Sequence, residues 1–524
     1  MNKIGFTNFR KFTNFPTIDL GGITVLVGGN NAGKSTLVKA MLLMRDFIQT
    51  RIVNSDDVRP VFKFDTEHVS IGNFSRAISR NSRKNGDTIT FELGIENFLI
   101  KVDVKGDKKS DMEPIVSTVT INDSQNTVVI TINYSENLVS LKFGVSKEAK
   151  DAKSRRKSIE NEIRKLRHQI GYDSFKNQQN IKPINLEEIS KKKAEIERLE
   201  KELKSLDNAP DSREDSVTIE LNDIFDFRAG NLLLPEIISG IVAYSSLDIQ
   251  ADRRTNVFSD EIGSKSIIKA KTPLLNNIVE RLNQAINNDV IEYIYAHSVS
   301  QQVFYNIVKD SSDYVTRAIH EFYQARISED DKEFGFLSHW LKEFEVGDSL
   351  DVIAMKGEAY QVLVYDKDNK KGIDLADKGM GSIQMTILLL RIATLIRMYK
   401  GANLTIILEE PEQNMHPALQ SKLAELINQV NIQFGVRFVV ETHSEYLVRH
   451  TQVLAAKKMY EEGYDLEKVN QNIKVYYISQ ERGVIDMLFM DNAKFQDNFD
   501  EGFFDQAARE SLTISRMERI FKNK

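Results

Sequence analysis

The pattern of apolar and polar positions predicts a body of alternating strands and helices. Residues 23–27 and 404–408 are short apolar runs, which are typical of strands buried on both faces. Each run precedes a stretch with helical apolar spacing, and residues 382–399 form another such stretch. Further runs alternate as strands do, at 88–93, 128–132, 217–221, 350–354, 360–364 and 437–440. This order indicates an α/β fold with helical insertions.

Residues 147–206 break this pattern, because Lys, Arg and Glu dominate them. Their apolar residues are spaced as in heptads, in two sets: Ile159, Ile163, Leu166 and Ile170, then Ile196, Leu199, Leu203 and Leu206. Gly171 and Pro183 lie in the polar stretch between the sets. We expect an antiparallel coiled-coil hairpin, and the alternative is two surface helices packed on the body. Residues from about 273 to 346 are expected to be mostly helical.

Composition narrows the class of protein. The 524 residues are 41% hydrophobic and 28% charged, as in ordinary soluble globular proteins. The absence of cysteine excludes disulfides, thiolate metal sites and a cysteine nucleophile, and it suits a cytoplasmic location. The net charge of −6 gives no support for bulk nucleic-acid binding. The most apolar stretch, 385–398, contains two arginines and is too short to span a bilayer, so no membrane association is expected.

A glycine-rich segment between the first apolar run and its helix carries the clearest chemistry. Residues 28–36 match the pattern G-x-x-x-x-G-K-[ST], in which backbone N–H groups at a helix N-terminus surround phosphate. Lys34 is expected to reach the β- and γ-phosphates, and the Ser35 hydroxyl to ligate Mg²⁺. The predicted nucleotide-binding residues of this loop are Gly28, Asn30, Asn31, Ala32, Gly33, Lys34, Ser35 and Thr36. The chain is therefore expected to bind ATP with Mg²⁺.

Two acids follow the apolar run 404–408 directly, where a phosphate-loop site needs carboxylates. We assign Glu409 to the metal and Glu410 to the general base that polarises the attacking water. Glu409 is one methylene longer than the aspartate usual at that position. The alternative is an acidic turn that favours the dipole of the next helix.

Two further segments complete the expected site. His443 directly follows a predicted strand, where it can sense the γ-phosphate or position the attacking water. Gly379, Gly381 and Ser382 precede the long helix and form a second anion-binding corner, or else a plain helix start. Because the first loop already surrounds its own phosphates, a phosphate at this corner is expected to belong to another subunit. His416 is expected only to fix its loop.

Together these motifs resemble the ABC-type ATPases of the recombination-repair and OLD-nuclease group, which share head domains with SMC and Rad50 proteins. Residues 8–12 and 500–505 extend the resemblance to both ends of the chain. It implies a homodimer or higher oligomer in which Lys34 and Ser35 of one subunit meet Gly381 and Ser382 of another across ATP. The segment Lys378 to Gln384 departs from the transporter signature L-S-G-G-Q, which argues against a transporter ATPase.

No D-x-D nuclease cluster follows residue 450. The chain therefore resembles the stand-alone PtuA-type ATPases of Septu and retron anti-phage systems, which implies a separately encoded effector nuclease as partner. DNA or a retron RNA–DNA complex is a further implied partner. The alternative is a DNA-maintenance ATPase of the RecF or SMC kind that clamps DNA. Arg253 and Arg254 are expected to contact phosphate or nucleic acid, or to form surface ion pairs.

In these terms the chain is expected to have five segments. The ATPase head is predicted to be built from residues 1–146, 208–270 and 348–524. The coiled-coil hairpin is predicted at 147–207 and a helical insertion at 271–347.

Overall fold

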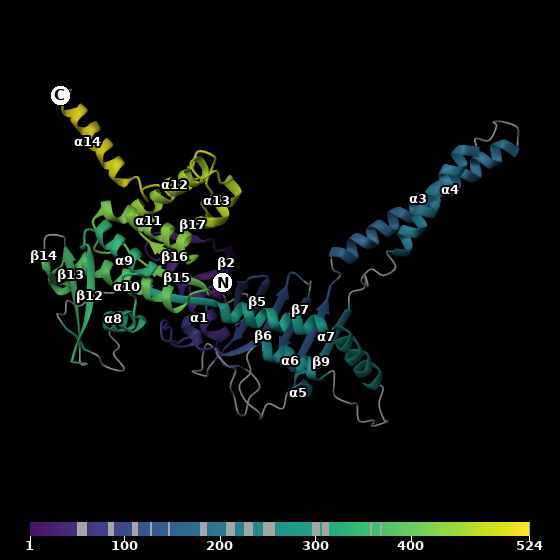
Figure 1. The fold of residues 1–524 in the computed structure, drawn as a ribbon, viewed down its shortest axis with the longest axis horizontal. Coiled ribbons are helices and arrows are strands. Elements are labelled where there is room, and N and C mark those ends of the chain that lie inside the picture. The colour runs from purple at the N-terminus through teal and green to yellow at the C-terminus, as the bar shows by residue number, and fades with distance from the viewer. Residues whose placement is uncertain are drawn as a thin grey trace.

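The computed structural model describes residues 1–49, 60–81, 88–106, 114–125, 128–144, 147–178, 186–205, 215–224, 234–244, 257–295, 304–306, 314–356, 359–366 and 369–522. Within these residues, three β-sheets organise the chain, and helices cover them (Figure 1). Arg253 and Arg254 lie outside the described residues, as does Leu206. The predicted α/β fold class is confirmed.

The six-stranded sheet is mostly parallel and holds the phosphate loop. Its order is β10-β15-β16-β3-β17-β18, and only β18 pairs antiparallel. Along β3, Leu26 belongs to one apolar core while Val25 and Val27 belong to the other, so the strand is buried on both faces. The strands are β3 (Ile23–Gly28), β10 (Asp289–Tyr295), β15 (Asn403–Glu409), β16 (Arg437–Thr442), β17 (Ile473–Ser479) and β18 (Gly483–Asp486).

Four helices pack around the sheet. Three of them follow a strand of the sheet, and α10 begins within the segment Lys378 to Gln384. Leu37 of α1 shares the core that contains Leu26, whereas α10, α11 and α12 contribute to the other core. At the end of α11, Gly435 has φ = 71°, the left-handed cap that favours glycine. The helices are α1 (Lys34–Gln49), α10 (Met380–Met398), α11 (Pro417–Phe434) and α12 (Glu445–Tyr460), and the shorter α13 (Leu466–Asn472) precedes β17.

Strand β10 corrects the expectation that residues 273–346 are mostly helical. Residues 289–295 pair in parallel with β15, from Asp289 opposite Asn403 to Tyr295 opposite Glu409. Their sequence, DVIEYIY, is rich in β-branched and aromatic residues, which favour strands. The preceding helix α7 (Val257–Asn288) contains Pro273 and crosses the boundary predicted at residue 270. Part of the predicted insertion therefore belongs to the central sheet.

The eight-stranded sheet is antiparallel and shares its core with α1, α6 (Leu234–Tyr244) and α7. Its order, β2-β1-β4-β5-β6-β7-β8-β9, joins residues on both sides of the charged segment, because β8 pairs with β9. The short helices α2 (Phe74–Ala77) and α5 (Leu221–Ile224) flank it. The strands are β1 (Lys3–Phe9), β2 (Phe12–Asp19), β4 (Thr88–Ile95), β5 (Phe98–Lys105), β6 (Ile115–Asp123), β7 (Val128–Asn133), β8 (Leu138–Phe143) and β9 (Asp215–Glu220).

The charged segment forms two long helices that lie side by side and extend away from the sheets (Figure 1). These are α3 (Lys147–Gln178) and α4 (Leu186–Ser205). Four residues of the predicted heptad sets form a small apolar core of their own: Ile159, Ile163, Ile196 and Leu199. Arg155 bonds Glu202 at 2.8 Å and Arg167 bonds Glu200 at 2.7 Å across the pair.

The third sheet packs with α8 (Tyr314–Ala325), α9 (Lys332–Glu343) and α10. It contains β11 (Tyr305–Asn306), β12 (Ser349–Met355), β13 (Ala359–Asp366) and β14 (Asn369–Asp374), followed by the 3-10 turn Leu375–Asp377. Among the helices that the structure describes, α10 is long and apolar enough to cross a membrane, but 78% of its most apolar window is buried inside the protein. Such burial is typical of a core helix. The chain ends in α14 (Gln506–Lys522), which extends outward (Figure 1).

Candidate nucleotide-binding site

The phosphate loop joins β3 to α1 and has the backbone that its sequence predicts. Gly33 has φ = 114°, and a Cβ there would lie 2.4 Å from the Phe12 ring, so the position requires glycine. Asn31 also has a positive φ of 58°. The turn is closed by the Ala32 N–H, which donates to the Gly29 carbonyl at 3.0 Å. This curl places the loop at the N-terminus of α1, where N–H groups bind anions.

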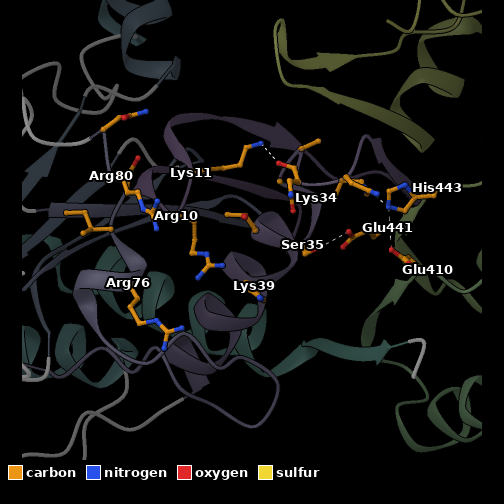
Figure 2. Close-up of a pocket in the computed structure, with 18 of the residues that line it drawn as sticks. Arg10, Lys11, Lys34, Ser35, Lys39, Arg76, Arg80, Glu410, Glu441 and His443 are labelled. Carbon is orange, nitrogen blue, oxygen red and sulfur yellow. Dashed lines mark hydrogen bonds and ion pairs between the residues drawn. The ribbon is translucent and has the colours of Figure 1, made fainter. Parts of the chain in front are cut away.

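A cavity of about 1130 Å³ opens beside this loop (Figure 2). Every residue from Asn30 to Thr36 lines it, and so do the predicted catalytic residues Glu410 and His443. Gly28 lies at the end of β3, beneath the loop. The volume of the cavity is enough for a nucleoside triphosphate, since ligand sites are commonly several hundred cubic ångströms. The structure therefore brings the predicted phosphate loop and two predicted catalytic side chains to one site.

Lys34 lies at the base of the cavity. Its ammonium donates to the Gly28 carbonyl at 2.9 Å and to His443 Nε2 at 2.9 Å. Burial lowers the pKa of Lys34 from its ordinary value, while Glu441 and Glu410 partly offset this effect. Lys34 is thus a buried cation whose direct hydrogen-bond partners are neutral. A phosphate group could take the place of these partners.

The loop that carries His443 is fixed by Glu412, a residue to which the sequence pattern gave no role. Glu412 Oε1 accepts hydrogen bonds from the Thr442 hydroxyl and from the His443 backbone N–H, each at 2.7 Å. The next residue, Ser444, caps α12 by accepting the Leu447 N–H at 3.1 Å. Burial lowers the pKa of His443, so the neutral ring can accept from Lys34. Glu412 is therefore a positioning residue for the loop that holds His443.

Glu410 lies beside the same histidine. Its carboxylate is 3.4 Å from His443 Nε2, and it also accepts a hydrogen bond from the Gln413 amide. Its backbone has φ = 42°, and its N–H donates to the Glu441 carbonyl at 2.8 Å. The strand end thus turns sharply at Glu410 and directs its carboxylate into the cavity (Figure 2). This placement suits a group that removes a proton from attacking water.

The Ser35 hydroxyl contacts a carboxylate other than Glu409, although Ser35 and Glu409 were both assigned to the metal. It donates to Glu441 Oε1 at 2.8 Å, whereas Glu409 accepts from the Tyr293 hydroxyl of β10. Glu441 lines the cavity and Glu409 does not. The expected proximity of Glu409 to Ser35 is therefore not observed, because Glu409 lies one strand further from β3. Glu441 was missed, although it is also an acid near the end of a parallel strand.

Burial raises the pKa of Glu441 to about 7, and the Ser35 hydrogen bond opposes this increase. Glu441 is 2% exposed, and its second carboxylate oxygen has no hydrogen-bond partner among the described residues. Such an orphaned oxygen fits a cation, so Ser35 and Glu441 have the chemistry to hold Mg²⁺. The described residues contain no cluster of three or more metal-type side chains, but magnesium beside nucleotide phosphates needs only one or two carboxylates.

The second predicted anion corner lies apart from this cavity. Gly379, Gly381 and Ser382 are absent from its lining and belong instead to the start of α10. Gly379 is exposed and gives the helix no side-chain cap, while a Cβ on Gly381 would lie 2.6 Å from the Asn414 carbonyl. Asn414 also donates to Gln384 at 3.0 Å. Within one subunit, the corner therefore packs against the loop that follows Glu410. His416 caps α11 through the Ala418 N–H at 3.3 Å, a loop-fixing contact.

Comparison with known proteins places these features in a family. Solved structures similar to the chain include heads of SMC proteins. One, from Pyrococcus furiosus, has an extended coiled coil and is bound to the C-terminal domain of ScpA; it is 10% identical, has a TM-score of 0.32, and the match covers 93% of this chain and 96% of that chain. Another is bound to the C-winged helix domain of ScpA; it is 11% identical, has a TM-score of 0.31, and the match covers 93% of this chain and 97% of that chain. The SMC head from Thermotoga maritima is similar at 10% identity (0.30, 91% and 94%). Because these TM-scores are low, the chain is assigned from its match to a sequence family.

No curated protein matches the chain significantly. The family model described as the AAA ATPase domain, in contrast, matches residues 1–448. That range includes the phosphate loop, both acids after β15 and His443. The chain belongs to this family of AAA ATPases.

Proposed function

We propose that the protein is an ATP-driven switch that dimerises around ATP and controls a separately encoded effector nuclease in bacterial anti-phage defence. The observation that carries the ATP-driven part is the convergence of Lys34, Ser35, Glu410 and His443 on one cavity. The signature corner at Gly379–Ser382 lies outside that cavity. In one subunit the phosphate loop and the second anion corner lie apart. This separation suits a site that is completed when the corner of a second subunit meets the phosphate loop of the first. The effector and the setting in defence rest on the motif resemblance.

In the proposed reaction, the phosphate-loop N–H groups and Lys34 hold the β- and γ-phosphates. Glu410 removes a proton from water as that water attacks the γ-phosphate, and the bond from the γ-phosphorus to the bridging β-phosphate oxygen breaks, giving ADP and phosphate. His443, which Glu412 holds in place, contacts the same γ-phosphate. When bound, Mg²⁺ would neutralise charge on the phosphates, and the Ser35 hydroxyl would be one of its ligands. Lys34 exchanges its present contact with His443 for phosphate, which leaves the histidine free to position the water.

Ser382→Arg tests the two-subunit site. The added side chain is expected to spare ATP binding, because Ser382 does not line the phosphate-loop cavity. It should block ATP-dependent dimerisation, measured by light scattering with the slow-hydrolysing Glu410→Gln change also present. Ser515→Arg on α14 is the matched control, since it adds the same group at an exposed position and should dimerise normally. A Ser382→Arg protein that dimerises as well as the control would contradict the model.

The defence role is tested with the gene and its native flanking genes in a phage-sensitive host. We expect protection to require both the phosphate loop and an adjacent nuclease gene, so Lys34→Ala or loss of that gene should restore plaque formation. Protection by the ATPase gene alone, unaffected by Lys34→Ala, would overturn the proposal. The purified wild-type protein should hydrolyse ATP whichever result is obtained, which separates the enzyme from its biological setting.

A second candidate, a DNA-clamping ATPase, is favoured by the charge of the other half of the cavity. Opposite Glu410 and Glu441, the cavity is lined by five cations: Arg10, Lys11, Lys39, Arg76 and Arg80 (Figure 2). None of the five has a carboxylate partner among the residues that the structure describes. The phosphate loop already provides for the nucleotide's β- and γ-phosphates, so these cations suit additional phosphates of a nucleic-acid backbone.

The double charge reversal Arg76→Glu with Arg80→Glu tests this candidate. If the protein clamps DNA, duplex DNA should stimulate the purified ATPase, and the double variant should lose that stimulation while retaining DNA-independent turnover. Each lost phosphate contact should also reduce the slope of log affinity against log salt by about 0.9. Lys400→Glu, at an exposed lysine after α10, is the control. ATPase activity that DNA does not change would exclude the clamp.

A further inference from the structure

Two glutamates lie at the same level on neighbouring strands of the central sheet. Glu409 ends β15 and is in register with Glu441 on β16. Strand β16 in turn pairs with β3, which leads into the phosphate loop. Glu441 is therefore one strand closer than Glu409 to the phosphate loop. Either carboxylate has the chemistry to hold a divalent cation, so their contacts must distinguish them.

Those contacts differ sharply. Glu409 accepts the hydroxyl of Tyr293, a residue of β10 on the side away from β3. Glu441 instead receives the Ser35 hydroxyl on Oε1 at 2.8 Å. Its Oε2 is buried and has no partner among the described residues. A buried carboxylate oxygen without a partner is costly, and a bound cation is a standard way to satisfy it.

The surrounding charges point the same way. Glu441 is subject to the fields of Glu409 and Glu410, and Lys34 is the cation that acts on it. Lys34 in turn is subject to the fields of Glu410, Glu412 and Glu441 and, in the opposite sense, of Lys11. The carboxylates around Lys34 and Glu441 therefore outnumber the cations. A divalent cation beside Ser35 would restore the balance and complete the coordination that Glu441 lacks.

We propose that Glu441, together with Ser35, holds the divalent cation of the bound nucleotide, and that Glu409 is kept out of this role by Tyr293. The inference rests on nucleotide binding at the phosphate loop, as in the proposed function. It replaces the assignment of Glu409 to the metal. It also gives β16 two tasks, because Glu441 lies near the end of this strand, His443 directly follows it, and both side chains line the cavity beside Lys34 (Figure 2).

The first test measures the affinity of the full chain for the non-hydrolysable analogue AMP-PNP, in Mg²⁺ and in EDTA. In the wild type, Mg²⁺ should increase affinity. Glu441→Gln should lose most of that increase, about tenfold or more in the Mg²⁺ concentration required. Glu409→Gln is the matched control, with the same chemical change on the neighbouring strand, and should behave as the wild type. Affinity in EDTA should be retained by both variants, which verifies that each is folded.

The second test uses the absence of cysteine from the chain. Glu441→Cys introduces a single thiol, and thiolates bind soft metals strongly. With Cd²⁺ and AMP-PNP, this variant should show the ultraviolet sulfur-to-cadmium charge-transfer band, whereas Glu409→Cys should not. Because the band reports the metal–sulfur bond directly, it does not depend on turnover.

The opposite pattern, with the Mg²⁺ effect lost in Glu409→Gln and the cadmium band present in Glu409→Cys, would overturn the inference and restore Glu409. A wild-type Mg²⁺ effect that neither Gln variant changes would also overturn it. In both cases wild-type binding of AMP-PNP would still support the proposed function. Failure of the wild type to bind AMP-PNP in either condition would instead contradict nucleotide binding itself.

Discussion

Replacing Lys34 with alanine is expected to abolish nucleotide binding. Lys34 is 4% exposed, and phosphate would replace His443 as a partner of its ammonium. Charge-assisted hydrogen bonds contribute roughly 1.5–3 kcal/mol each. Loss of two such bonds to the β- and γ-phosphates corresponds to at least about a hundredfold weaker binding. Equilibrium titration with a fluorescent ATP analogue measures the change.

A matched lysine separates this effect from a general loss of stability. Lys422 on α11 is partly buried and donates to the Glu343 carbonyl at 2.8 Å, away from the cavity. Lys422→Ala should therefore lose local contacts but bind ATP as the wild type does. Lys34→Ala also removes a cation from a group of carboxylates, so its melting temperature should be compared with that of the control. Retained ATP affinity in Lys34→Ala would refute the assignment of the phosphate loop.

The central strands could be predicted because a parallel sheet buried on both faces requires continuous apolar runs. The runs at 23–27 and 404–408 meet that requirement and correspond to β3 and β15. Strand β10 was missed because it lies at the sheet edge and contains Asp289 and Glu292 among its apolar residues. Its β-branched and aromatic residues favour a strand, but only the pairing with β15, more than a hundred residues later, places it in the central sheet. Local sequence does not contain that information.

The site shows the same division between local and long-range information. The phosphate loop is a local motif, so its residues could be identified from their spacing alone. The choice between Glu409 and Glu441 depends on strand order, because β16 lies between β15 and β3. It also depends on Tyr293, which comes from the strand that sequence analysis missed. A single error in strand assignment therefore extends to the assignment of a site residue.

Glu410→Gln is expected to bind ATP normally and to hydrolyse it slowly. The substitution keeps the size of the side chain but removes the group that accepts a proton from water. Loss of a general base lowers turnover by a factor on the order of a hundred or more. Single-turnover measurement of phosphate release gives the rate of the chemical step. The ATP-bound dimer should accumulate in this variant, because closure no longer leads to hydrolysis.

Glu409→Gln is the decisive comparison for that prediction, since the two acids are adjacent but have different surroundings. Glu409 is bound by Tyr293, whereas Glu410 faces His443 at 3.4 Å within the cavity. If this geometry determines their roles, Glu410→Gln must impair hydrolysis far more than Glu409→Gln does. Should Glu409→Gln be the more damaging change while Glu410→Gln turns over normally, the base would be Glu409. The Tyr293 contact would then have to break when ATP binds, which Tyr293→Phe would reveal as faster turnover.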